Sequence, residues 1–195
     1  TLNRLAVGAA GLTMNLGLGD LAVTAGAATM TVSAANATVN AALVNLGTLS
    51  IASTRTAKFA ASAASGLTIA TANVAGPNTA GDVAMNPSDT GAANGILDLG
   101  ASNFTISTLN STGILQLTGE QSGVHTVTNN GSTAGIIEYY DGLAAGTVFD
   151  DIVSAAPNYY HLRVSGSAQT FTVNGDIEVA GDVILDGSVL AAGAT

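Results

Sequence analysis

Acidic side chains come nearest to a catalytic pattern in this sequence. Hydrolysis of a glycosidic bond needs two carboxyl groups that face each other across the substrate, and the chain offers Asp150 with Asp151 and the acids of residues 182–186. Neighbouring strand residues point to opposite faces, so Asp150 and Asp151 would not converge. His161 and Arg163 would share a face, but one imidazole beside one guanidinium does not make an acid–base pair. We therefore expect no catalytic residues and no enzyme, and keep a polysaccharide-active β-helix as a second alternative.

Oxygen ligands for a metal ion are the next candidates. Asp82, Asp89, Asp150 and Asp151 fall in segments without a strand pattern, and carboxylates suit Ca²⁺. They do not form an Asp-x-Asp-x-Asp-Gly loop, and the chain contains no cysteine, which excludes thiolate metal sites and disulfides. No Gly-x-x-x-x-Gly-Lys phosphate loop is present. We expect no cofactor and assign no metal ligands, with a calcium ion left open.

Two tyrosine pairs, Tyr139-Tyr140 and Tyr159-Tyr160, flank one irregular stretch of the sequence. Because strand residues alternate between faces, one ring of each pair should point inward and the other outward. The inward rings would anchor the irregular stretch to the interior. The outward rings would suit a carbohydrate, which we keep as an alternative partner. His125 and His161 fall in strand-like segments, where we expect hydrogen-bonded side chains rather than metal ligands.

The composition indicates a narrow interior and a weakly charged surface. Hydrophobic residues make up 47% of the 195 residues, but aromatic residues only 4% and charged residues only 9%. A wide globular core uses large rings, so a core of similar-sized aliphatic side chains favours a thin cross-section. The net charge of −9 argues against nucleic acid and against an anionic membrane surface as partners. No apolar run is long enough for membrane insertion, and scarce surface charge removes a usual guard against self-association.

Short alternations of apolar and polar residues recur along the chain. The first five begin at Leu12, Leu21, Met30, Val39 and Leu49, so their starts follow one another in steps of nine or ten positions. Alternation with a period of two over four or five residues is typical of a strand. Residues near 73–95 and 139–158 lack the pattern, so we predict two loop excursions from a single domain spanning 1–195. Later alternations begin at Leu67, Ile96, Phe104, Ile114 and Val124.

A six-residue repeat near the end of the chain is the most specific pattern. Gly175, Gly181, Gly187 and Gly193 are spaced by six, in register with two sets of aliphatic residues. This arrangement suits one side of a coil, with inward aliphatic side chains and a glycine at positive φ in each turn. The two aliphatic sets are Val173, Val179, Leu185 and Ala191, and Ile177, Val183 and Val189.

These patterns together predict an all-β fold, a parallel β-helix (β-solenoid) with about three short strands per turn. With roughly 25–30 residues per turn there would be about seven turns and a rod about 30–35 Å long, since neighbouring strands lie about 4.8 Å apart. The right-handed form is favoured, because the strand spacing is mostly nine to ten residues rather than six throughout.

The carboxyl-terminal part of the chain, from Tyr159 onward, resembles repetitive β-helix segments of large bacterial cell-surface proteins, both adhesins and filament-forming proteins. The resemblance rests on residues 159–166 (Tyr-Tyr-His-Leu-Arg-Val-Ser-Gly) followed by the glycine ladder of residues 173–185. It implies a stalk, adhesin or filament role at the cell surface, with no catalytic residues to carry over. The ladder is also similar to that of bactofilins, cytoskeletal filaments built from a β-helix, although the long loops and the near absence of lysine depart from that family.

The two ends of the predicted coil have no recognisable cap. Open end coils expose strand edges and core side chains, and we assign end-coil self-association to Leu2, Leu5, Val7, Val189 and Leu190. Residues 1–80 carry a net charge of +2 and residues 81–195 a net charge of −11. Head-to-tail contact would bring these unlike ends together.

The sequence therefore predicts a structural subunit of an extracellular filament, sheath or surface layer, whose partners are copies of itself in a head-to-tail homopolymer. The alternative is a stalk or passenger block of a giant bacterial adhesin.

Overall fold

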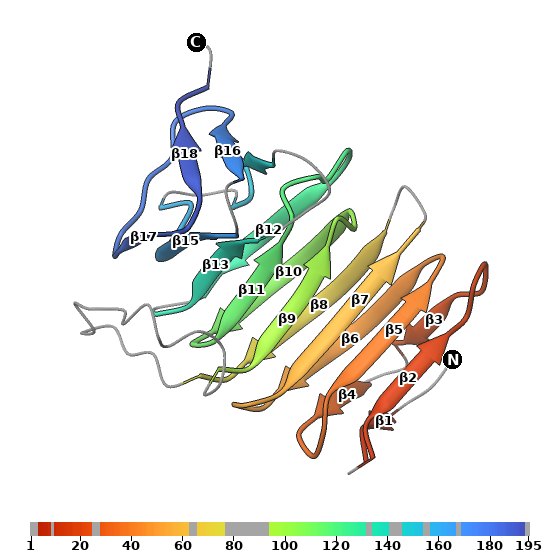
Figure 1. Cartoon of the computed structure of the whole chain (residues 1–195). Coiled ribbons are helices and arrows are strands. Elements are labelled where there is room, and N and C mark those ends of the chain that lie inside the picture. The colour runs from red at the N-terminus through yellow and green to blue at the C-terminus, as the bar shows by residue number, and fades with distance from the viewer. Residues whose placement is uncertain are drawn as a thin grey trace.

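The chain folds into an all-β, parallel β-solenoid, as predicted (Figure 1). The computed structural model describes residues 4–8, 10–24, 28–62, 66–76, 94–131, 134–140, 146–153, 157–166 and 169–193, and none of these is helical. No helix that could span a membrane is found among them. The strands are β1 (Arg4–Ala6), β2 (Leu12–Asn15), β3 (Leu21–Val23), β4 (Thr29–Val32), β5 (Ala37–Ala41), β6 (Val44–Ile51), β7 (Thr56–Ala61), β8 (Leu67–Val74), β9 (Ile96–Gly100), β10 (Phe104–Ser111), β11 (Ile114–Leu117), β12 (His125–Asn130), β13 (Ile136–Tyr139), β14 (Thr147–Val148), β15 (His161–Ser165), β16 (Thr170–Val173), β17 (Val183–Asp186) and β18 (Val189–Ala191).

The coil contains three parallel sheets. The first runs β1-β4-β6-β8-β10-β12, with β3 also paired to β6. The second has eight strands in the order β17-β15-β13-β11-β9-β7-β5-β2, and the third has three, β14-β16-β18. Because each strand pairs with the strand one turn away, successive turns stack along the axis, as Figure 1 shows for β2 to β13.

The long strands of the first sheet each turn a corner. In β6 the buried residues are Val44 and Leu46, then Leu49 and Ile51, so the alternation shifts by one residue at Gly47–Thr48. The same shift occurs in β8 and β10. Each of these strands therefore supplies two sides of the coil, and the second sheet supplies the third side. Gly47 fits this corner because a Cβ there would lie only 2.9 Å from the Ala28 carbonyl oxygen.

The solenoid has about seven turns, whose lengths are uneven. In the second sheet Leu97 pairs with Leu115 on one side and with Ala57 on the other, so one of these two turns is more than twice as long as the other. Most turns are shorter than predicted, because the corners need only a few residues. Seven steps between eight strands give a rod of about 34 Å. The handedness stays a prediction.

The long turn contains the first predicted excursion, near 73–95, of which residues 77–93 lie outside the described part of the chain. The second excursion, near 139–158, is partly structured. It holds β14, and Val153 forms a parallel bridge with Val127. The described residues of this stretch therefore contribute to the coil.

The interior is a column of mostly aliphatic side chains, with a cluster of aromatic rings from Tyr139, Phe149, Tyr159 and Phe171 near β13–β16. Tyr139 and Tyr159 are fully buried, and their hydroxyl oxygens are 2.8 Å apart. Tyr159 Oη donates to the Phe149 carbonyl at 2.6 Å, and the Phe149 amide donates to Tyr139 Oη at 3.3 Å. The predicted inward rings therefore anchor residue 149, within the second excursion.

Asparagine side chains join successive turns at the corners. The Oδ1 atoms of Asn36, Asn103 and Asn158 each accept a hydrogen bond from a backbone amide about twenty residues further along the chain, at 2.9 Å. These bonds satisfy amides that the sheets leave free at the corners. They give one physical reason for the abundance of asparagine in this chain.

One expectation about the six-residue glycine repeat is wrong. Of its four glycines only Gly187 has a positive φ, 74°. Gly181 and Gly193 instead pack closely on backbone atoms of the preceding turn, and Gly175 lies against the Asp150 side chain. A Cβ on Gly193, for example, would collide with the Val173 carbonyl oxygen. The repeat thus records contact between turns rather than a repeated left-handed corner.

Candidate functional site

The residues predicted for self-association lie on the two end turns, except Leu2, which is outside the described residues. Leu5 in β1 is partly buried, and Val7 is buried, with its amide bonded to the Thr31 carbonyl. At the other end, Val189 is 55% exposed and Leu190 packs partly against the core beside Phe171. Val7 is therefore the member of this set with little surface to offer a partner.

Two further residues on the carboxyl-terminal end turn occupy core positions but are about half exposed. Val183 and Leu185 in β17 pair with Leu162 and Val164 in β15. Leu162 and Val164 are fully buried, whereas Val183 is 50% and Leu185 52% exposed. Since they occupy the inward positions of the last turn, their exposed faces are the open end of the hydrophobic column.

The same two columns reach the other end of the second sheet at Leu12 and Met14 in β2. Register pairs lead from Leu12 through Ala37 and Ala57 to Leu97, and on through the later strands to Val183. Leu12 and Met14 are partly buried, and β2 and β17 are the outermost strands of the sheet. Among the described residues, the second sheet therefore ends on each side in an unpaired strand edge beside two incompletely covered core side chains, a combination suited to parallel strand addition.

Charged and amide side chains form a second feature, a column on the outer face of the second sheet. Lys58, Asp98, Gln116, Glu138 and Arg163 follow one another in register across five strands. Lys58 Nζ is 3.1 Å from Asp98 Oδ2, and Gln116 Nε2 donates to Glu138 Oε2 at 2.8 Å. Asp98, Glu138 and Arg163 are 4–6% exposed although they face outward. We call these five residues the charged column.

Neighbouring side chains add hydrogen bonds and ion pairs to the charged column. Tyr140 Oη donates to Asp98 Oδ1 at 2.7 Å, and Ser165 Oγ donates to Glu138 Oε1 at 2.6 Å. Arg163 Nη2 donates to Asp186 Oδ2 at 2.7 Å, and its Nε lies 3.4 Å from Glu138 Oε1.

Burial, together with the hydrogen bond to Asp98, raises the pKa of Tyr140 well above its ordinary value. Since Asp98 and Glu138 are both held by several protein groups, the column serves as a cross-link between turns.

The sequence carried a sign of this column that strand spacing alone did not reveal. Each member stands between two inward apolar residues, as in Leu97-Asp98-Leu99 and Leu162-Arg163-Val164. These triplets come into register only after the uneven turn lengths are known. The five residues of the charged column could therefore be identified from the sequence, but which of them are neighbours could not.

The other chemical candidates are separated or already engaged. Asp151 contacts His125, with Oδ1 3.0 Å from Nε2, and the His125 ring lies 3.8 Å from that of Phe149. His161 is buried, and its Nδ1 accepts a hydrogen bond from the Asp182 amide at 3.0 Å.

Asp82 and Asp89 lie outside the described residues. Within the described ranges no three histidine or acidic side chains come together as a metal site.

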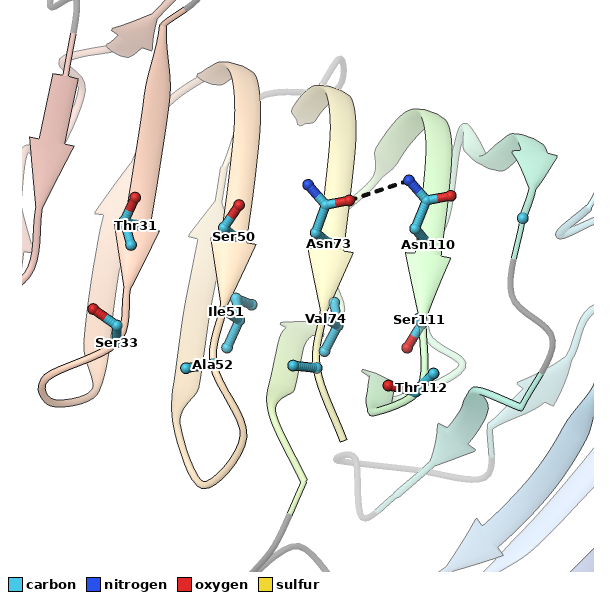
Figure 2. Close-up of a pocket in the computed structure, with 12 residues that line it drawn as sticks. Thr31, Ser33, Ser50, Ile51, Ala52, Asn73, Val74, Asn110, Ser111 and Thr112 are labelled. Carbon is cyan, nitrogen blue, oxygen red and sulfur yellow. Dashed lines mark hydrogen bonds between the residues drawn. The ribbon is translucent and has the colours of Figure 1, made fainter. Parts of the chain in front are cut away.

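A shallow groove of about 430 Å³ is the third feature (Figure 2). It crosses the ends of β4, β6, β8 and β10, where Thr31, Ser50, Asn73 and Asn110 occupy one register position in four successive turns. Asn110 Nδ2 donates to Asn73 Oδ1 at 3.1 Å, the bond drawn in Figure 2. No charged side chain is among the described residues that line this groove.

Comparison with known proteins identifies no relative of this chain. No protein-family model matches the chain, and no curated protein or solved structure matches it either. The class that the coordinates define is a parallel β-solenoid of about seven turns with three parallel sheets.

Proposed function

We propose that this protein is a structural subunit that assembles head to tail into an extracellular filament, sheath or surface layer. The observation that carries the proposal is the half-exposed pair Val183 and Leu185, in the inward columns of the last turn, next to the unpaired edge of β17. A further turn stacked there would bury both side chains and pair that edge.

The other end of the same solenoid offers the matching surface. Its outermost strand β2 has the same parallel direction, and Leu12 and Met14 stand in the same two columns. Half-burying a valine and a leucine contributes about 1 kcal/mol each, and the strand edges add backbone hydrogen bonds. A contact between two different surfaces of one subunit gives an open filament when it does not close into a ring.

Charge supports the same polarity. Arg4 is exposed on β1 within the half of the chain that carries +2, whereas the other half carries −11. Head-to-tail contact would therefore place a strongly acidic end against a weakly basic one. Screening by salt would weaken this contribution.

The outer surface fits a role in an assembly outside the cell. Outward threonines such as Thr68, Thr105 and Thr126 stand in register, and charged residues are only 9% of the chain. A neutral hydroxyl-bearing surface is wetted by water but repels other copies weakly. The resemblance of the last turns to bacterial cell-surface β-helices supports the same location.

Electron microscopy and sedimentation of the purified chain test the proposal. We expect unbranched fibres with an axial repeat of about 38 Å, because the seven strand spacings within a subunit are followed by one spacing between subunits. The double variant Val183→Asp, Leu185→Asp should sediment as a monomer, because it places two charges in the contact. Thr105→Asp, on the side of the rod, is the matched control and should still polymerise. Wild-type protein that stays monomeric at every concentration would overturn the proposal.

A further inference from the structure

The groove at the ends of β4, β6, β8 and β10 is suited to an extended ligand. It crosses four neighbouring strands (Figure 2), and its lining also includes Gly131, which follows β12. Four steps of about 4.8 Å make it about 19 Å long, parallel to the rod axis. A Cβ at residue 131 would lie 2.5 Å from Asn110 Oδ1, so this glycine leaves room for the Asn110 amide at that end of the groove.

We call Thr31, Ser50, Asn73 and Asn110 the Thr31–Asn110 column, and their side chains have unused hydrogen-bonding capacity. The bond from Asn110 Nδ2 to Asn73 Oδ1 fixes both amides, which leaves the Asn73 amino group as a donor and Asn110 Oδ1 as an acceptor. In the described structure the hydroxyl groups of Thr31 and Ser50 have no protein partner in this column. Donors and acceptors therefore follow one another along the axis, one turn apart.

The chemistry of the lining restricts the occupant. None of the described lining residues is charged, and the chain carries a net charge of −9, so an anionic polymer gains no ion pair and is repelled overall. An extended peptide would need free backbone groups, but β6, β8 and β10 each pair with neighbours on both sides. The methyl groups of Ala52 and Ala75, which are not buried, also line the groove.

We infer that the groove binds a linear, neutral polysaccharide lying along the rod. Such a chain offers hydroxyl groups for the Thr31–Asn110 column and C–H faces for the methyl groups of Ala52 and Ala75. This inference does not depend on polymer formation, since all lining residues belong to one subunit.

Nuclear magnetic resonance of the ¹⁵N-labelled chain tests the inference. The probes are linear hexasaccharides of β-1,4-linked glucose, xylose and mannose, with an oligomer of galacturonic acid as the charged comparison. We expect at least one neutral hexasaccharide to shift the side-chain amide signals of Asn73 and Asn110. The double variant Asn73→Ala, Asn110→Ala and the groove-filling Ser50→Trp should each weaken binding about tenfold or more.

Thr68→Trp, an outward position of the same sheet outside the groove, is the matched control and should bind as the wild type does. Signal dispersion in each spectrum verifies that the variant is folded. Three results would overturn the inference: no shift with any neutral hexasaccharide, equal binding of the galacturonic acid oligomer, or equal weakening by Thr68→Trp. Shifts of the same amides with protein concentration alone would assign the groove to a second copy and overturn it as well.

Discussion

Val183 lies directly beside Leu162 across two parallel strands, yet Leu162 is fully buried and Val183 is 50% exposed. The two side chains belong to one inward column, so their difference in exposure shows how much burial a further stacked turn provides. On the last turn, residues at inward positions of the coil are therefore exposed to solvent. This relationship makes the end of the rod the place where the proposed contacts between subunits are expected.

Cysteine cross-linking should detect the proposed register between subunits. If Val183 of one copy stacks on Leu12 of the next, then Leu12→Cys protein mixed with Val183→Cys protein should form a disulfide-linked dimer under mild oxidation. The strand spacing of about 4.8 Å lies within the Cα separation that a disulfide allows. The natural chain has no cysteine, so a reducible dimer on a denaturing gel is unambiguous.

Thr13→Cys is the control for this experiment, because Thr13 points to the other face of β2. Mixed with Val183→Cys, it should cross-link much less. Equal yields from both mixtures would contradict the register. If fibres form but Leu12→Cys does not cross-link, the protein polymerises through a contact other than the stacking of Val183 on Leu12.

The strands could be predicted from the sequence because alternation is a local property. Leu12, Leu21 and Met30 begin or lie in β2, β3 and β4 as expected, and the paired tyrosines divide between interior and surface. Register could not be predicted, because it depends on the length of every connection. More than twice as much chain separates Lys58 from Asp98 as separates Asp98 from Gln116, yet both pairs are neighbours.

The same reason accounts for what sequence reasoning misses at the candidate site. The sequence places Val183 in an aliphatic repeat, but its proposed partner Leu12 is a neighbour only in a second subunit. The Thr31–Asn110 column likewise joins strands whose separation in sequence differs nearly twofold between its shortest and its longest step. No local pattern encodes such a column.

Removal of Arg163 should destabilise the fold strongly. Its guanidinium is 4% exposed and contacts both Glu138 and Asp186. Arg163→Met would leave the buried Glu138 carboxylate without its cation, at a cost of about 3 kcal/mol in the free energy of unfolding. Chemical denaturation followed by circular dichroism measures this loss.

Two further variants distinguish a charge effect from a packing effect. The double variant Arg163→Met, Glu138→Gln removes both charges and should recover part of the lost stability. Lys58→Met should cost under about 1 kcal/mol, because the Lys58 side chain is half exposed. A double variant no more stable than Arg163→Met alone would argue that the charge pair is not the cause.

Glycines that pack on the preceding turn should not tolerate a methyl group. At Gly95 a Cβ would lie 2.6 Å from the Ala75 carbonyl oxygen and 2.8 Å from that of Ala52. Because backbone atoms cannot yield as a flexible side chain does, Gly95→Ala should lower the free energy of unfolding by about 2 kcal/mol or more. Gly8→Ala is the control, since nothing lies within 4 Å of a Cβ there. Equal stability of the two variants would contradict the close packing.

The buried tyrosine pair should respond differently to single and double substitution. Tyr159→Phe removes the donor to the Phe149 carbonyl and the partner of Tyr139 Oη, so two buried polar groups lose a bond. We expect a loss of about 2 kcal/mol in the free energy of unfolding. Adding Tyr139→Phe removes the orphaned Tyr139 hydroxyl but also the acceptor of the Phe149 amide, so it should cost less than Tyr139→Phe does in the wild type. Strict additivity of the two losses, measured by chemical denaturation, would show that the hydroxyl groups act independently.

Alkaline pH should unfold this solenoid through the same tyrosines. Burial raises the pKa of both Tyr139 and Tyr159 well above the ordinary value, since a phenolate would be desolvated there. In the unfolded chain a tyrosine ionises near pH 10. The unfolded state then loses protons that the folded state keeps, so stability is full below about pH 10 and falls as the pH rises above it. Thermal melting between about pH 8 and pH 11 should show this fall, smaller in the double variant Tyr139→Phe, Tyr159→Phe, where Tyr140 still contributes. The same fall in the wild type and the double variant would assign the alkaline sensitivity to groups other than the buried pair.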